Sequence, residues 1–188
     1  MANQEISKTA PKVYSYQFNS LDWYPVCFMI PFNIEELLNA AESTIRMKFE
    51  YGKTYLLRLV NALMNRDLFF MIAGHNLTVV GWDAGYVIPV TTDYIFISTG
   101  QTSDILVTAN QKPGEYYMIA TPYFDAVGTE DFDSSTASAI FQYTGNYTQK
   151  TPYLPAFVPN YVDMASARAF VEQTGTEPMK DKGGQPPP

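Results

Sequence analysis

The sequence predicts an all-β sandwich with short flanking helices. Short apolar runs rich in β-branched and aromatic residues recur at intervals of roughly ten residues, a spacing typical of sandwiches. Turn-forming Gly, Asn, Asp and Pro residues separate these runs. The chain is also 46% hydrophobic, with 14 Tyr and 12 Phe, which supplies enough apolar surface for a sizeable core. The helix signals lie outside this region.

The expected strands follow one another from residue 45 onward. In 45–49 apolar and basic residues alternate, the pattern of a strand with one face in water. Apolar residues run together at 95–97 and 106–107, which predicts strands that are buried on both faces or covered by another domain. After 45–49, the complete set of β-rich runs is 55–63, 68–72, 77–80, 94–98, 105–109, 116–121 and 137–143. The turns between them are 51–53, 65–67, 74–76, 99–101 and 112–114.

The core is expected to come from the apolar residues of these strands. Its members are Leu57, Leu59, Phe70, Ile72, Val79, Ile95, Ile97, Leu106, Val107, Ile119, Ile140 and Phe141. Two charged residues within the runs, Arg58 and Asp104, are expected to point outward and to be structural, because an outward charge keeps a strand soluble.

The segments on either side of the sandwich differ from it in composition, and we therefore divide the chain into four segments. Residues 1–42 form a divergent N-terminal segment that is expected to be poorly structured. Residues 43–145 form the sandwich domain. Residues 146–174 form a proline-rich exit segment that ends in a short helix capped by Asp163. Residues 175–188 read as a disordered tail.

Charge and composition exclude some classes of partner. The net charge is −7 and basic residues form no run, so neither nucleic acid nor a membrane surface is an expected partner. The longest apolar run, 26–30, is too short to span a bilayer and is closed by Pro31. The first residues contain no apolar stretch of a secretory signal, so the chain as written is expected to be cytoplasmic. The lone Cys27 cannot form an internal disulfide and is expected to be a buried thiol.

An ordered series of motifs extends over about residues 43–172. The motifs are 51–62 (YGKTYLLRLVNA), 68–70 (LFF), 74–80 (GHNLTVV), 83–89 (DAGYVIP), 100–111 (GQTSDILVTANQ), 123–125 (YFD) and 139–143 (AIFQY). Together with the proline-rich stretch and the helix after Asp163, this series resembles the second plastocyanin-like (cupredoxin) domain of plant laccases, which are multicopper oxidases. Residues 1–42 and the tail depart from the family pattern.

The resemblance implies a Greek-key cupredoxin-like β-sandwich that is one of three such domains in an oxidase. Laccases oxidise phenols at a type 1 copper and reduce dioxygen to water at a trinuclear copper cluster. In this family the copper ligands lie in the first and third cupredoxin domains, while the middle domain spaces them and forms one wall of the substrate cleft. The implied partners are those two domains and, in the intact secreted enzyme of the apoplast, phenolic substrates.

No copper is expected on this chain itself. A blue-copper site takes two imidazoles and a thiolate, usually with a weak axial Met. The chain has one histidine, His75, and one cysteine, Cys27, and it contains neither the His-x-His nor the His-Cys-His motif of the family. The expected role is therefore that of a middle domain, structural and cleft-forming, present as an oxidase fragment that is inactive alone.

Three residues are candidates for the substrate-cleft wall: His75, Trp82 and Asp125. Each has a simpler interpretation. His75 follows Gly74 at an expected turn and fits a turn or surface histidine that makes local hydrogen bonds. Trp82 fits ordinary core packing, and Asp125 fits a solvated acidic loop over 125–133.

Two tripeptides match the acceptor pattern for N-glycosylation. They begin at Asn76 and Asn146. Asn146 is expected in the loop after the last strand and therefore to be the more accessible of the two. Both matter only for a chain that enters the secretory pathway.

Two other classes of function are open at this point. The first is a free-standing, non-catalytic β-sandwich binding module, which secondary-structure content and solution mass would test. The second is an unrelated hydrolase or another metal-free enzyme. The sequence offers little for it, because it has one histidine, no Gly-x-Ser-x-Gly elbow and no Gly-rich phosphate loop.

Overall fold

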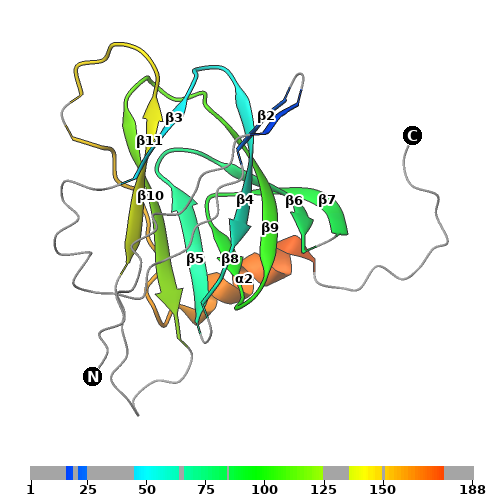
Figure 1. The fold of residues 1–188 in the computed structure, drawn as a ribbon. Coiled ribbons are helices and arrows are strands. Elements are labelled where there is room, and N and C mark those ends of the chain that lie inside the picture. Colours follow the sequence, from blue (N-terminus) through cyan, green and yellow to red (C-terminus); the bar gives the residue numbers. More distant parts are fainter. Residues whose placement is uncertain are drawn as a thin grey trace, which may run out of the picture.

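A computed structural model shows two β-sheets that face each other across a shared core, with one helix packed at the side (Figure 1). The residues that the structure describes are 16–18, 21–24, 45–63, 66–83, 85–124, 136–149 and 151–175. The all-β sandwich expected from the sequence is confirmed. Among these residues no helix has the length and apolar character needed to cross a membrane.

One sheet has six strands. Their spatial order is β1 (Tyr16–Phe18), β2 (Leu21–Tyr24), β4 (Thr54–Val60), β9 (Thr102–Thr108), β6 (Leu77–Trp82) and β7 (Gly85–Thr92). β4 and β9 form its antiparallel centre, and β2 joins β4 in parallel. β7 ends the order, so its outer edge has no neighbour among the described strands.

The second sheet has five strands. Their order is β3 (Arg46–Phe49), β11 (Ala137–Tyr143), β10 (Glu115–Tyr123), β5 (Asp67–Ile72) and β8 (Ile95–Ile97). β3 runs parallel to β11, although the two strands are far apart in the sequence. The chain passes from one sheet to the other after β2, β3, β4, β5, β7, β8 and β9. Most strand pairs therefore join distant parts of the chain.

The strands expected from the sequence all appear, with ends that differ by a few residues, but β7 is not among them. Its Pro89 lacks a backbone N–H and argues against a central strand, whereas the edge of a sheet tolerates proline. β7 is also largely exposed, with Tyr86 at 91% and Ile88 at 77%. It therefore lacks the buried face by which a strand is recognised in a sequence.

Two short strands fall inside the N-terminal segment 1–42, for which the sequence predicts little structure. β1 and β2 form an antiparallel hairpin, and β2 extends the six-stranded sheet. The rest of that segment, including Cys27, and the tail 176–188 lie outside the described residues. The segment boundaries stay predictions.

The expected core is buried except at Leu106, where the prediction is wrong. β9 alternates strictly: Ile105 and Val107 are 0% and 1% exposed, whereas Leu106 is half-buried on the outer face. The run of apolar residues hides the period of two along this strand, and the pairing with β4 and β6 decides which side chains turn inward. The inward set is therefore Ser103, Ile105 and Val107.

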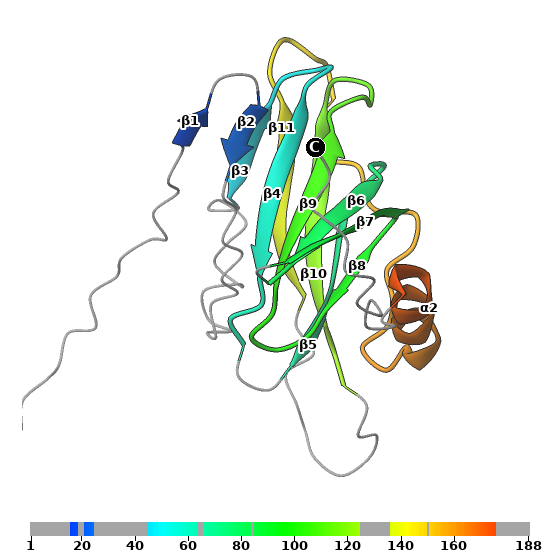
Figure 2. The ribbon, with the colours of Figure 1, turned by 90° about the vertical axis from the view of Figure 1, so that its right-hand side faces the viewer.

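The exit helix α2 (Met164–Thr174) covers part of the outer face of the five-stranded sheet (Figure 2). Asp163 caps it as expected, because its carboxylate accepts a hydrogen bond from the Ser166 amide at 2.9 Å. Ala167 packs into a cluster with the outward side chains of this sheet, where Phe96 lies 5.1 Å from the Phe69 ring. The apolar run 95–97 is thus covered by side chains of this same chain.

Arg58 and Asp104 point outward, as expected, and they face each other as cross-strand partners on β4 and β9. Arg58 Nε donates to Asp104 Oδ1 at 2.8 Å, and Nη2 donates to Oδ2 at 3.4 Å. This pairing raises the pKa of Arg58, chiefly through the side-chain hydrogen bond. The two charges therefore support the central strand pair without entering the core.

The two neighbours on β9 allow a matched test of the register. We expect Ile105→Ala to lower the free energy of unfolding by about 2–5 kcal/mol, because it leaves a cavity between the sheets. Leu106→Ala should cost about 1 kcal/mol, since the side chain is only half-buried. Urea unfolding of both variants measures the difference, and equal losses would contradict the register described above.

A double-mutant cycle tests the Arg58–Asp104 pair. Each single change to Ala should cost about 1 kcal/mol or less, because both side chains reach solvent. The coupling energy between the two sites should be about 0.5 kcal/mol and should fall as salt is added. A single loss several times larger would mean that one of these charges has a buried partner instead.

Candidate functional site

His75, the single histidine of the chain, lies inside the sandwich. It follows Gly74 in the turn between β5 and β6 and is 3% exposed. Gly74 has a φ of +68°, a backbone conformation that residues with a side chain rarely adopt, and a β-carbon added there would lie 3.4 Å from the ring of Tyr116. The interpretation of His75 as a turn histidine is confirmed, and the alternative of a surface histidine is excluded because the side chain is buried.

Both ring nitrogens of His75 are engaged within the chain. Nδ1 lies 2.8 Å from the Ala73 carbonyl oxygen, and Nε2 lies 2.8 Å from the Tyr143 hydroxyl. A carbonyl oxygen can only accept, so Nδ1 carries the proton and Nε2 accepts from Tyr143. The Tyr143 oxygen in turn accepts from the Gln111 amide at 2.9 Å. This chain of hydrogen bonds ties the β5–β6 turn to β11 and to the β9–β10 loop.

Aromatic rings surround the imidazole and keep it neutral. The ring centroids of Tyr116 and Phe141 lie 4.9 and 4.6 Å from that of His75. Burial lowers the pKa of His75 below its ordinary value, and burial raises the pKa of Tyr143 to about 12. Both side chains are therefore uncharged at neutral pH and suit a structural role.

The chain's side chains do not fit a copper site. The sequence holds one imidazole and one thiol, and the imidazole of His75 already uses both nitrogens. Cys27 lies outside the described residues. Within the part of the chain that the structure describes, no group of three or more His, Cys, Asp or Glu residues could hold a metal ion.

The candidate cleft residues do not gather in one place. His75 precedes β6 and Trp82 ends it, so the two lie at opposite ends of that strand. Trp82 is half-buried and packs edge-on against Phe170 of α2, with ring centroids 5.9 Å apart. Asp125 and the acidic residues Glu130, Asp131 and Asp133 lie outside the described residues.

A buried asparagine that the sequence did not single out closes the end of the sandwich opposite His75. Asn61 is 1% exposed and follows β4. Its Nδ2 donates to the carbonyl oxygens of Arg66 and Ile97 at 2.8 and 3.1 Å, and its Oδ1 accepts from the Leu63 amide at 3.1 Å. An asparagine between an apolar run and a loop is a weak sequence signal, because its partners come from elsewhere in the fold.

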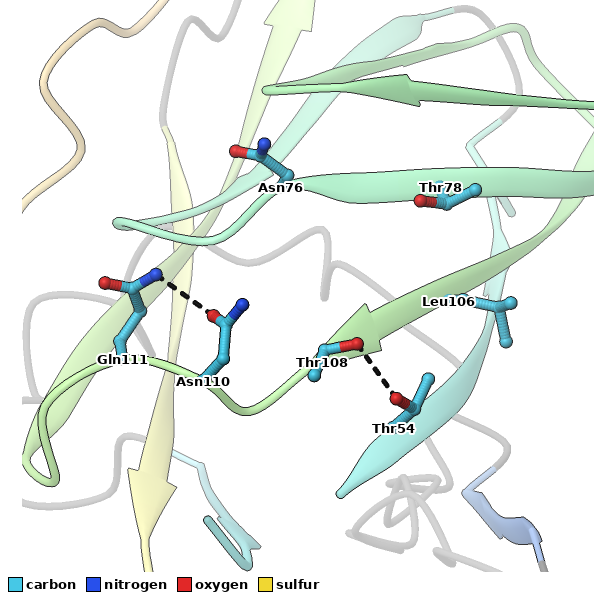
Figure 3. Close-up of a pocket in the computed structure, with 7 residues that line it drawn as sticks. All are labelled: Thr54, Asn76, Thr78, Leu106, Thr108, Asn110 and Gln111. Atoms are coloured by element: carbon cyan, nitrogen blue, oxygen red, sulfur yellow. Dashed lines mark hydrogen bonds between the residues drawn. The ribbon is translucent and has the colours of Figure 1, made fainter. Parts of the chain in front are cut away.

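The two glycosylation candidates are both exposed. Asn146 lies in the loop after β11, whereas Asn76 lies at the start of β6 beside a shallow depression of about 270 Å³ (Figure 3). The residues that line this depression are Thr54, Asn76, Thr78, Leu106, Thr108, Asn110 and Gln111. They come from three strands and two loops, and apart from the tripeptide that begins at Asn76 no sequence motif marks them.

A comparison with protein families matches residues 7–146 to the family described as multicopper oxidase. The match begins well before residue 43 and so includes most of the N-terminal segment. The expectation that residues 1–42 depart from the family pattern is therefore wrong. This segment contains aromatic residues but no sustained hydrophobic period. A strand pair as short as β1 and β2 is therefore difficult to recognise in the sequence.

Plant proteins are similar over most of the chain. It is 40% identical over 159 residues to putative laccase-1 of Oryza sativa subsp. japonica, a match that covers 81% of this chain and 26% of the relative. It is 42% identical over 137 residues to laccase-3 of Arabidopsis thaliana, covering 69% and 24%. The chain thus spans about a quarter of the length of these relatives.

Solved structures support the fold alone. The crystal structure of a laccase from Botrytis aclada superimposes with a TM-score of 0.52 at 23% identity, covering 63% of this chain and 24% of that one. Its L499M mutant gives a TM-score of 0.51 at the same identity.

The buried histidine predicts a pH dependence of stability. Because the pKa of His75 is lowered in the folded chain, the unfolded chain takes up the proton first as pH falls below about 6.5. The contribution of neutral His75 to the free energy of unfolding should be fully present above that pH. It should decrease below it, by at most about 1.4 kcal/mol per pH unit.

Urea unfolding between about pH 5 and pH 8 measures this slope. His75→Phe is the control, because it keeps an aromatic ring and removes the only imidazole of the chain. The variant should be less stable at neutral pH and should lack the slope between about pH 5.5 and pH 7. A slope that survives in the variant would assign the effect to other groups.

Proposed function

The chain belongs to the multicopper oxidase family, and we propose that it serves as the copper-free middle cupredoxin domain of a laccase-type oxidase. The observation that carries this proposal is the state of His75. A copper ligand must offer a free ring nitrogen, whereas here Ala73 and Tyr143 occupy both. Its place between Phe141 and Tyr116 is that of a core side chain.

The surface supports a role between other domains. Tyr86 and Ile88 on the edge strand β7 are 91% and 77% exposed, and Leu154 and Phe157 of the exit segment are 71% and 58% exposed. Large exposed apolar side chains of this kind are typical of contact surfaces. The first and third cupredoxin domains of the oxidase are the proposed partners.

In this arrangement the chain contributes position and shape. Copper bound by the partner domains would supply the electron transfer from phenol to dioxygen. The sandwich would hold those domains at a fixed separation, because its core is packed with apolar side chains and the buried His75 and Asn61 at its two ends are hydrogen-bonded. The identity of the phenol would depend on the partner domains as well.

A reconstitution experiment tests the copper-free role. We expect the purified chain, refolded with Cu(II), to show no intense blue absorption and not to oxidise phenols, because a type 1 centre needs two imidazoles and a thiolate. Visible absorption, bound copper per chain and dioxygen uptake are the measurements. Stoichiometric blue copper with dioxygen consumption by the isolated chain would overturn the proposal, whereas weak adventitious copper would not.

A chimera tests the spacer role directly. The corresponding segment of a plant relative is replaced by this chain, and the unaltered relative is the control. We expect the chimera to bind copper and to oxidise phenols. A chimera that folds but stays inactive, combined with a monomeric isolated chain, would favour a free-standing binding module instead.

A further inference from the structure

The depression beside Asn76 has an uncharged and mostly polar lining. All 7 residues that line it are uncharged, and their side chains offer hydroxyls, amides and one aliphatic group (Figure 3). Asn76 and Thr78 stand on the β6 side, Thr108 and Leu106 on β9, and Thr54 on β4. At about 270 Å³ it is smaller than the roughly 300–1,000 Å³ of pockets for drug-sized molecules. A single sugar ring suits both its size and its chemistry.

The hydroxyl and amide groups lie where a sugar could reach them. The Thr54 and Thr108 hydroxyls lie 2.9 Å apart and are exposed, and the amide side chains of Asn110 and Gln111 are joined at 3.0 Å at the rim. Each of these hydroxyl and amide groups can form a further hydrogen bond besides the one described. Leu106, which also lines the depression, gives an apolar side chain for the face of a ring.

Two of the lining residues belong to an acceptor triplet for N-glycosylation. Asn76 and Thr78 are the first and third residues of Asn-Leu-Thr, and both face the depression. We propose that Asn76 carries an N-linked glycan whose first N-acetylhexosamine lies in this depression. The inference rests on the proposed function in one respect, since an oxidase of this type would meet the modifying enzyme in the secretory pathway.

The attachment point is held rigidly. The preceding residue, His75, is fixed by its two hydrogen bonds, and the following residue, Leu77, is 0% exposed in the core. The side chain of Asn76 therefore has little freedom to turn away from the outer face of the sheet. Asn146, by contrast, follows Gly145, whose φ is +113°, in an exposed loop and does not line the depression.

The modification forms one bond and breaks another. A lipid-linked oligosaccharide pyrophosphate is the sugar donor. A bond forms between Asn76 Nδ2 and C1 of the first sugar, the bond between C1 and the donor pyrophosphate oxygen breaks, and one amide proton is lost. Two consequences can be measured separately: occupancy of Asn76, and protection of its first sugars by the depression.

The experiment uses the full 188-residue chain, expressed behind a secretion leader in eukaryotic cells. Peptide mass spectrometry gives the occupancy at Asn76 and Asn146. Native digestion with an endoglycosidase gives the release rate at each site. We expect Asn76 to be occupied and its glycan to be released about fivefold more slowly than that at Asn146, the factor for one net hydrogen bond.

The double variant Thr54→Val and Thr108→Val removes the two hydroxyls and keeps the β-branched shape. This double variant should leave the glycan occupancy of Asn76 unchanged. It should raise the rate at which the endoglycosidase releases the Asn76 glycan to the rate measured at Asn146. Asn76→Gln should remove the modification there and leave Asn146 as it was.

Two results would overturn the inference. One is an unmodified Asn76 in folded, secreted protein, whether or not Asn146 is modified. The other is an equal release rate at the two sites, which would mean that the depression does not hold the sugar. Neither readout depends on oxidase activity, so a failure here is distinct from a failure of the chimera.

Discussion

The hydrogen bond between His75 and Tyr143 is the interaction on which this end of the sandwich depends. It joins the turn after β5 to the end of β11, so it links a turn that leaves one sheet to the last strand of that sheet and, through the Gln111 amide, to the β9–β10 loop. Each group is buried and has its partner, so removal of either would leave a buried polar atom unpaired. Asn61 satisfies the same requirement at the other end.

Between these two ends the core is aromatic and closely packed. Phe49 of β3 stacks on Phe141 of β11, with centroids 3.6 Å apart, and the edge of Tyr55 from the facing sheet meets Phe49. The imidazole of His75 lies against the same Phe141. Burial among these rings lowers the pKa of His75, so the imidazole is neutral, and both of its nitrogens are hydrogen-bonded. These are the properties of a side chain with a structural role in the core. A core of this kind suits the proposed role of a middle domain, because that role needs a stable shape.

The outer surface is uneven in a way that fits the proposed roles. The edge strand β7 and the exit segment expose large apolar side chains, whereas the outer face of β4, β9 and β6 carries the Arg58–Asp104 pair and the mostly polar Asn76 depression. Apolar surface at an edge suits contact with a neighbouring domain. A polar face that carries a glycan would stay in solvent, so the two proposals assign different faces of the domain to different tasks.

The sequence by itself determined the fold class, most of the strands, the Asp163-capped helix, the family, and the shortage of copper ligands, because period, caps, ordered motifs and composition are read along the chain. Only the tertiary structure decided that His75 is buried, that Ile105 and not Leu106 turns inward, and that Arg58 meets Asp104. These outcomes depend on pairing between strands that are distant in sequence, such as β4 with β9, which no local pattern specifies. The edge strand β7 was not predicted for a related reason: it is largely exposed, and a strand without a buried face shows no hydrophobic period in the sequence.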